Sequence, residues 1–474
     1  CVQEPLLSGY PSEMALEFYA LPNVGVDSPP PSAPPSAPTS GYQTGRSFKV
    51  CNHVPSWTRV SPRYTVYVRD SASSPWHEVP TYITASKSPA DDLASQGYPA
   101  NHIHDSQYEP GNAENLYGWT HSFANFEGRA STVELKVVTD RALRSARVEP
   151  TSFGSVERVE GREVYMTLTC PNHVHVDINE QFRGEPWPLT SDLSVTWAGN
   201  NGGYAAYNPP KHALTIHCNP MESHSILSRA GIKIKQPGDA MPSLTRGDTV
   251  YFAAGVHRLS AINGSGYTVN YETVVAGAQY YIPCDAVIEG SFYSASTSDV
   301  VITGYGIISG DHKLHPGDDR AVTGINNVGS ECWSTDSDPD GFERCAVYSP
   351  VSMIGSNLTV TGITVVDAAF HTFRLADTTF SAQTFSTLLH VKTITWRKNG
   401  DGIITDANVR VEDVFFRCQD DSYYINGHGM RNAVLWNDYN GASILFSKIG
   451  SMTGSNRADV VTVEDVHVLY ARAH

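Results

Sequence analysis

The hexapeptide "VRVEDV", residues 409–414, returns almost unchanged as "VTVEDV" at residues 461–466. The segments "LTVTGI" (358–363) and "LHVKTI" (389–394) share its pattern, in which the first, third and sixth residues are apolar. Such a unit is a short strand, a tight turn and another strand, and it cannot bury its apolar side alone. The two near copies lie 52 residues apart, a distance that suits two coils of a stacked structure. We therefore predict a right-handed parallel β-helix over residues 216–474.

Residues 42–215 carry a different pattern. Short runs such as "YTVYVRD" (64–70) and "ALTIHC" (213–218) alternate apolar with polar residues and are separated by turns rich in Pro, Gly, Asn and Ser. This pattern is typical of an antiparallel β-sandwich, so the predicted fold class is all-β, with the sandwich preceding the β-helix. Residues 1–41 contain "PPPSAPPSAP" (29–38) and are expected to form an extended proline-rich tether.

The last copy of the repeat is followed closely by the final residue, His474. A solenoid needs a terminal cap over its apolar edge. The β-helix is therefore expected to be incomplete at its C-terminal end, and another segment or a second subunit would complete it. Such an open end would favour homo-assembly from head to tail.

Composition excludes several classes of partner. The formal net charge is −16, with 49 acidic against 33 basic residues, so no basic stripe is available for nucleic acid. No run of about 18 apolar residues occurs, and no membrane span is predicted. The eight cysteines include no C-x-x-C pair, which argues against a zinc site.

Other features are typical of an extracellular glycoprotein, secreted or held at the cell surface. Cys332 and Cys345 enclose the polar loop "WSTDSDPDGFER", and we favour a disulfide between them. Asn263-Gly-Ser and Asn357-Leu-Thr are acceptor sequences for N-glycosylation.

The segment "NGDGIITDANVRVEDVFFRCQDD" (399–421) holds Asp401 in a glycine-rich turn and ends on the adjacent pair Asp420 and Asp421. Asp401 and Asp420 are 19 residues apart, close to one coil, so neighbouring coils would bring their carboxyl groups to within several ångströms. Three carboxylates this close cannot all ionise cheaply, and one is held protonated. One acid with one or two bases is what glycoside hydrolysis needs, although aspartates are also common as turn caps.

These residues carry a specific resemblance. "NGDGI" (399–403), then "QDD" (419–421), "YY" (423–424) and the strand "AVLWND" (433–438) are similar to the active-site segment of the dextranase and isopullulanase family, glycoside hydrolase family 49. Members of this family have an N-terminal β-sandwich before a right-handed β-helix. The resemblance implies that Asp420 is the general acid and that Asp401 and Asp421 hold and activate the water of an inverting reaction. The implied activity is endo-hydrolysis of a neutral α-glucan of the dextran or pullulan type, with no cofactor and no metal.

Nearby aromatic residues are natural partners for sugar rings, and their alternative role is packing between coils. A histidine there could bond a substrate hydroxyl or tune a carboxylate. In an ideal strand Asp420 and Asp421 would point to opposite faces, so the strand has to end or bulge at this point if both are to face the cleft. The expected substrate-binding residues are Trp396, Tyr423, Tyr424, His428 and Trp436.

Three alternatives stay open. From Asp421 to Met430 the chain has no lysine or arginine, where the family usually carries a lysine, which leaves room for a structural or carbohydrate-binding glycoprotein on the same β-helix. "GHG" (427–429) is also found in polygalacturonases, but their Arg-x-Lys is represented here only by Arg431. Pectate lyases share the fold and use calcium. Asp336, Asp338 and Asp340 resemble the beginning of a calcium loop, yet Val347 stands where its bidentate Glu is required.

Overall fold

The computed structural model describes residues 43–44, 47–85, 120–178, 210, 212–222, 231–259, 261–262, 269–311, 348–377, 385–397, 399–405, 408–424, 429–437, 441–445 and 461–470. All of them belong to one compact unit, Ser40–His474, and the other unit is Cys1–Thr39. Every regular element among the described residues is a β-strand. The tether predicted for residues 1–41 lies outside them.

Two sheets form the predicted sandwich. One has the order β1-β2-β6-β12-β11-β8, with β5 beside β6, and the other has the order β4-β3-β7-β10-β9. Neighbouring strands are antiparallel except for β6 and β12, which are parallel. The strands are β1 (Gln43–Thr44), β2 (Phe48–Val50), β3 (Tyr64–Arg69), β4 (His77–Val79), β5 (Thr81–Ala85), β6 (Thr120–Gly128), β7 (Thr132–Thr139), β8 (Ala146–Glu149), β9 (Gly154–Glu160), β10 (Glu163–Thr169), β11 (Asn172–Ile178) and β12 (His212–Pro220).

Burial differs between the two sheets. In β7 buried residues alternate with partly exposed ones, as expected for a sheet with one face in solvent. In β6, β11 and β12 almost every residue is buried. Both faces of their sheet are therefore covered, one by the other sheet and one by the β-helix.

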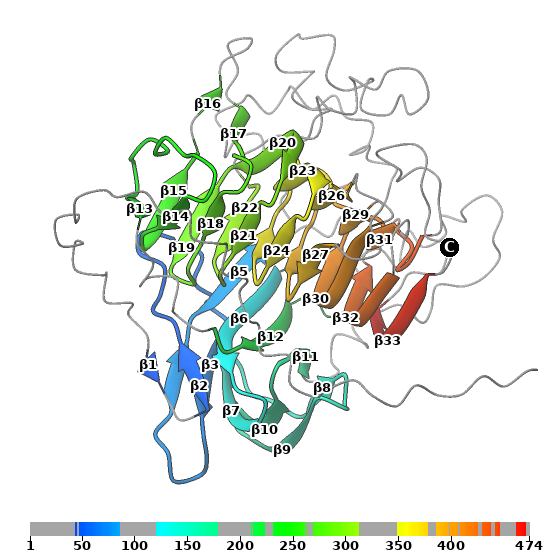
Figure 1. Ribbon diagram of the computed structural model, residues 1–474. Helices are drawn as coiled ribbons and strands as arrows, with labels where there is room; N and C mark the ends of the chain where they lie inside the picture. The colour runs from blue at the N-terminus through cyan, green and yellow to red at the C-terminus, as the bar shows by residue number, and fades with distance from the viewer. Residues whose placement is uncertain are drawn as a thin grey trace, which may run out of the picture. The chain divides into compact units, whose positions relative to one another are not determined.

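Parallel strands stack into the β-helix (Figure 1). One continuous sheet wraps around two of its faces and includes the long strands β30, β32 and β33, and a second sheet has the order β16-β17-β20-β23-β26-β29-β31. The strands are β13 (Ile232–Lys235), β14 (Thr249–Phe252), β15 (Gly255–Arg258), β16 (Ala261–Ile262), β17 (Val269–Thr273), β18 (Gln279–Tyr281), β19 (Ala286–Glu289), β20 (Ser291–Ser298), β21 (Val301–Thr303), β22 (Ile307–Ser309), β23 (Val351–Ser356), β24 (Thr359–Thr361), β25 (Thr364–Val366), β26 (Phe373–Asp377), β27 (Ser386–Leu389), β28 (Lys392–Ile394), β29 (Ile403–Thr405), β30 (Val409–Cys418), β31 (Tyr423–Tyr424), β32 (Gly429–Asn437) and β33 (Thr462–Tyr470).

A column of left-handed residues explains the repeated hexapeptide. Strand pairing aligns Thr361, Leu389, Glu412, Arg431 and Glu464 on successive coils. The residue after each of these has a positive φ, between 48° and 81°, and turns the chain from one face of the β-helix to the next. Glycine, asparagine and aspartate tolerate this conformation best, and histidine is also found in it. The corner residues are Gly362, His390, Asp413, Asn432 and Asp465.

The strand pairing confirms the predicted spacing of the two near copies and corrects the alignment of a third segment. Val411 pairs with Met430, and Met430 pairs with Val463, so the two near copies are two coils apart, as predicted. The segment "LHVKTI" is shifted, because Ser386, and not Leu389, pairs with Val409. The in-register segment is "STLLHV" (386–391), which begins with a serine and has His390 at its corner, so the apolar pattern fits better three residues later. The predicted fold class, a β-sandwich followed by a right-handed parallel β-helix, is confirmed.

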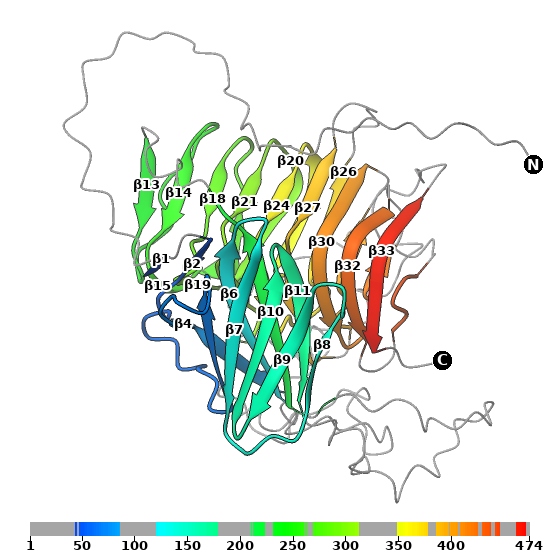
Figure 2. The same ribbon diagram turned by 90° about the horizontal axis from the view of Figure 1, so that it is seen from below.

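The sandwich packs directly on one side of the β-helix. Tyr82, Phe123 and Ala213 of the sandwich share an apolar cluster with Ile394 and Trp436 of the β-helix. Figures 1 and 2 both show β6 and β11 on the same side of the stacked coils, where β11 contacts β30. A domain boundary after residue 215 falls inside β12, and the domain limits at 41 and 215 stay predictions.

Histidines are concentrated in this contact. His121, His173 and His217 project from β6, β11 and β12, and all three are buried. They form a hydrogen-bonded chain between two β-helix groups, with donor-acceptor distances of 2.8 to 3.3 Å. In order, the groups are the Asp413 carbonyl, His173, His217, the Thr215 hydroxyl, His121 and the Arg417 guanidinium.

Two disulfides lie within the described residues. Cys51 is bonded to Cys284 and so links the sandwich to the β-helix, and Cys170 is bonded to Cys218 inside the sandwich. Cys418 is buried and belongs to neither of these disulfides. The disulfide predicted between Cys332 and Cys345 lies outside the described residues.

Candidate active site

The three candidate catalytic residues, Asp401, Asp420 and Asp421, lie at one corner of the β-helix. On three successive coils, the chain turns from β25, β28 and β30 into β26, β29 and β31. Strand β30 ends at Cys418 and β31 begins at Tyr423, so Asp420 and Asp421 lie in the turn between them. The strand therefore ends where it has to end for two adjacent aspartates to face one site.

Strand register aligns two of the three aspartates. Phe373, Ile403 and Tyr423 are neighbours on adjacent coils, and so are the residues two positions before each of them. Those residues are His371, Asp401 and Asp421. Backbone hydrogen bonds of 2.9 Å, from Thr372 to the Asp401 carbonyl and from Gly402 to the Asp421 carbonyl, hold the column together.

Glycine is required after Asp401 because the coils approach closely there. A Cβ on Gly402 would lie 2.2 Å from the carbonyl oxygen of Ser422 on the next coil. The glycine after Asp401 in the "GDG" turn therefore allows Asp401 to lie directly against the coil that carries Asp420 and Asp421.

The three carboxyl groups converge. One carboxylate oxygen from each of Asp401, Asp420 and Asp421 lies within 4.8 Å of the other two. Asp401 is 1% exposed and Asp420 is 6% exposed, whereas Asp421 is more open. Carboxyl groups of inverting glycosidases are usually about 6.5 to 9.5 Å apart, so this separation does not itself predict inversion.

Burial controls the charge of this cluster. It raises the pKa of Asp401 well above the usual range, and the nearby Asp420 and Asp421 carboxylates add to the effect. A hydrogen bond from the Tyr424 hydroxyl acts in the opposite direction. Within the part of the chain that the structure describes, the Asp401 Oδ1 atom is buried and has no hydrogen-bond partner. Burial therefore favours the protonated form of Asp401 in the free protein.

Residues of the following coil hold Asp420 and Asp421 in place through hydrogen bonds. The amide of Ala442 donates to Asp421 Oδ1 at 2.6 Å, and Asn437 Nδ2 donates to the Asp420 carbonyl at 2.9 Å. Asn437 is fully buried and also accepts from the hydroxyls of Ser422 and Ser443. Sequence reasoning missed Asn437, although it ends the strand "AVLWN" one coil after the aspartates.

Two further side chains touch the cluster. His371 Nε2 lies 3.6 Å from Asp401 Oδ2, and the His371 ring stacks on Phe370. Sequence reasoning missed His371 because the coil between His371 and Asp401 is 30 residues long. The Tyr424 hydroxyl is hydrogen-bonded to the carboxyl groups of both Asp401 and Asp421. Burial and these carboxylates raise the pKa of Tyr424, so it stays a neutral donor.

Three of the expected sugar-binding aromatic residues face the protein interior. Trp436 is fully buried between the sandwich and the β-helix, where its ring packs on His175 and Tyr470. Tyr423 is fully buried in the β-helix core, and its hydroxyl donates to the Gly429 carbonyl. The Trp396 indole donates to Thr84 and lies against Arg417. These contacts correspond to the packing role that is the alternative for Trp396, Tyr423 and Trp436, and their stacking on sugars stays a prediction. Outward and inward positions in a coil cannot be told apart without its register.

Several predicted residues cannot be placed. His428, Asn263 and the loop with Asp336, Asp338 and Asp340 lie outside the described residues. Asn357 is exposed in a left-handed turn, and its side-chain amide donates to Asp299. Its glycosylation stays a prediction.

The acidic cluster is also the kind of oxygen-rich set that a divalent cation takes. Asp401, Asp420 and Asp421 would be the ligands. A carboxyl ligand has to be deprotonated, and the raised pKa of Asp401 opposes this. Binding of a cation would therefore have to displace the proton that burial favours on Asp401.

Two dextranases are similar in sequence to this chain. The chain is 21% identical over 350 residues to a dextranase of Arthrobacter globiformis, which covers 68% of this chain and 52% of that protein. It is 21% identical over 351 residues to a dextranase of Arthrobacter sp. (strain CB-8), which covers 69% and 52%. The chain thus spans about half the length of these relatives. No family model matches.

The solved structure of Dex49A from Penicillium minioluteum has the same fold. It superposes with a TM-score of 0.62 at 18% identity and covers 91% of this chain and 76% of that one. The resemblance to the dextranases of glycoside hydrolase family 49 is confirmed. Within the described residues, the structure contains no helix of the length and apolarity that a membrane crossing needs.

Proposed function

We propose that this protein is an extracellular glycoside hydrolase that cleaves within a neutral, dextran-like α-glucan. The observation that carries this proposal is the meeting of Asp401, Asp420 and Asp421 at one corner, with oxygens within 4.8 Å and one carboxyl held protonated by burial. The similarity to two dextranases supports the substrate class. The two disulfides support an oxidising, extracellular location.

The division of roles is part of the proposal. Asp420 donates a proton to the leaving glycosidic oxygen, and Asp401 and Asp421 orient and deprotonate the attacking water, with inversion at the anomeric carbon. Because the three carboxyl groups are coupled, their protons belong to the group as a whole. The pKa of Asp401, raised by burial, means that Asp401 stores a proton before substrate binds. A role for Asp420 as the acid then requires that the proton move between neighbouring carboxyl groups on binding.

The proposal is tested by release of reducing ends from dextran, pullulan and polygalacturonate. Asp420→Asn is expected to lower kcat on dextran by about 10²- to 10⁴-fold. Asp413→Asn is the matched control, since Asp413 occupies a corner of the same coil, and asparagine fills the equivalent corner at Asn432. Wild-type activity that survives in Asp420→Asn would refute the assignment.

A substrate with a good leaving group shows which aspartate is the general acid and which is the general base. Departure of dinitrophenolate needs no proton, so only the variant that lacks the general acid should regain activity on a dinitrophenyl α-glucoside oligomer. Recovery in Asp420→Asn supports the proposed roles, and recovery in Asp401→Asn would exchange them. Proton NMR of the first anomer released tests inversion directly.

A second candidate is a structural or carbohydrate-binding glycoprotein, which the absence of lysine and arginine from Asp421 to Met430 favours. No release from any of the three polysaccharides would support it. Activity on polygalacturonate alone would indicate a pectinase.

A further inference from the structure

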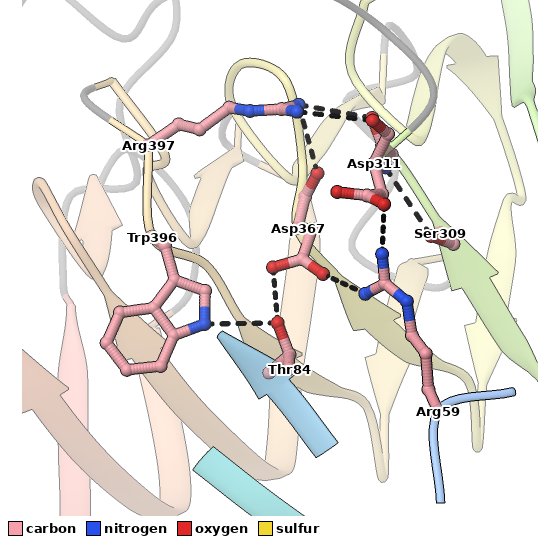
Figure 3. A network of polar contacts seen from close by, with 8 residues as sticks. Arg59, Thr84, Ser309, Asp311, Asp367, Trp396 and Arg397 are labelled. Carbon is pink, nitrogen blue, oxygen red and sulfur yellow. Dashed lines mark hydrogen bonds and ion pairs between the residues drawn. The ribbon is translucent and has the colours of Figure 1, made fainter. Parts of the chain in front are cut away.

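A buried polar network joins the sandwich to the β-helix close to the acidic corner (Figure 3). Arg59, which precedes β3, donates to the carboxylates of Asp367 and Asp311 on two coils. Thr84 on β5 donates to the other oxygen of Asp367 and accepts from the Trp396 indole at 3.0 Å. Asp367 thus binds two side chains of the sandwich at once.

Arg397 closes the network on the β-helix side. Its guanidinium donates to the carbonyls of Gly310, Asp311 and Asp367 at 3.2 to 3.4 Å. Asp367 and Arg397 are both buried, with exposed fractions of 5% and 7%. Figure 3 shows Arg59 and Thr84 reaching this group from one side and Arg397 from the other.

Trp396 and Arg397 belong to the turn that ends at Asp401. The Gly400 amide donates to the Arg397 carbonyl at 2.9 Å, and the Thr395 hydroxyl donates to the Gly400 carbonyl at 2.9 Å. A Cβ on Gly400 would lie 2.6 Å from the Arg397 carbonyl, so the packing there is tight. The residue just before Asp401 is therefore fixed by the same segment that the sandwich binds.

We propose that Thr84 and Arg59 are positioning residues, through which the sandwich holds the turn that presents Asp401 to the other two aspartates. This inference rests on the proposed hydrolase function for its effect on rate. Neither residue touches the carboxyl cluster, and both act through Asp367, Trp396 and Arg397. Catalytic carboxyl groups need placement to within about 0.5 Å, and a shift of about 1 Å can cost 10²-fold in rate.

A matched pair of substitutions on one strand tests this inference. Thr84→Val keeps the shape of the side chain and removes the hydroxyl that bonds Asp367 and Trp396. Thr81→Val is the control, because Thr81 is equally buried on β5 and its hydroxyl donates to the Val79 carbonyl inside the sandwich. Thr84→Ser restores the hydroxyl and is the conservative rescue.

Two readouts are measured on the full chain. The first is hydrogen exchange by mass spectrometry in a peptide that covers residues 395–402, which needs no substrate. We expect at least about threefold faster exchange in Thr84→Val than in Thr81→Val or Thr84→Ser. The second is dextran hydrolysis, for which we expect Thr84→Val to lose about 10-fold or more in kcat with KM within about twofold.

The outcomes separate this inference from the proposed function. Equal exchange in Thr84→Val and Thr81→Val would overturn the inference whatever the activity. Faster exchange with kcat unchanged would show that the contact does not serve catalysis and would also overturn it. If the wild type cleaves no glucan, the proposed function fails, and the exchange experiment alone decides whether the sandwich holds this turn.

Discussion

The histidines between the sandwich and the β-helix make a quantitative prediction about acid stability. Burial lowers the pKa of His121, His173 and His217 well below 6.5, and nearby basic side chains lower it further. For His173 a hydrogen bond to the Asp413 carbonyl acts in the opposite direction. Arg417 faces His121, and Lys392 faces both His173 and His217. These three histidines therefore stay neutral in the folded protein, whereas in the unfolded chain they take up protons near pH 6.5.

The sign and size of the effect follow from proton linkage. The contribution of these histidines to the free energy of unfolding is fully present above about pH 6.5. It is lost as the pH falls below that value, because only the unfolded chain binds the protons. Between pH 7.5 and 5.5 each histidine contributes a loss of about 1.4 kcal/mol, or about 4 kcal/mol for the three. Buried carboxyl groups such as Glu272, whose pKa burial raises to about 7, act in the opposite direction. The histidine part is therefore best isolated by comparing variants.

The perturbation is His217→Gln, whose amide can still bond the Thr215 hydroxyl. Unfolding by guanidinium is followed by tryptophan fluorescence at both pH values, because Trp436 packs against this contact. The variant should lose about 1.4 kcal/mol less than the wild type between pH 7.5 and 5.5. His53→Gln is the control, since His53 is exposed on the sandwich surface. Equal losses in His217→Gln and the wild type would refute the reasoning.

Two more predictions concern geometry and stability. A Cβ at Gly441 would lie 2.0 Å from the Asp420 carbonyl carbon, so Gly441→Ala should displace the acidic pair and lower kcat on dextran by about 10²-fold. Gly161→Ala, whose Cβ meets nothing within 4 Å, should leave kcat unchanged, and equal kcat values in the two variants would contradict the prediction. Replacing Cys51 and Cys284 by alanine opens a loop of 233 residues and should lower unfolding free energy by about 3 to 5 kcal/mol in guanidinium titrations. A loss below about 1 kcal/mol would show that the unfolded chain is little constrained by this bond.

The sequence predicted what depends on short-range pattern. The repeated hexapeptides indicate a β-helix because each copy spans one corner of a coil, and the "GDG" and "DD" turns are recognisable since a turn and a strand end leave local signals. The strand boundary at Cys418 makes both Asp420 and Asp421 available to the site.

The remaining contacts depend on coil length, which varies with every loop. His371 and Asp401 are 30 residues apart, whereas Asp401 and Asp421 are 20 apart, although all three share one column. The buried position of Trp436 leaves no local signal for a related reason, because only the packed sandwich shows which side of its coil is covered. The pairing of Cys51 with Cys284 joins two domains and leaves no local signal in the sequence.

The spacing of the left-handed corner residues gives the length of each coil in this fold. Successive corners at Gly362, His390, Asp413 and Asn432 are 28, 23 and 19 residues apart, so each interval measures how much loop has been inserted into one coil. Such marks depend on backbone conformation and not on side-chain chemistry. We expect such marks to persist where identity has fallen to about a fifth, as it has between this chain and the dextranases. Alignment of distant β-helix proteins by their corners would place equivalent coils opposite each other before any catalytic residue is compared.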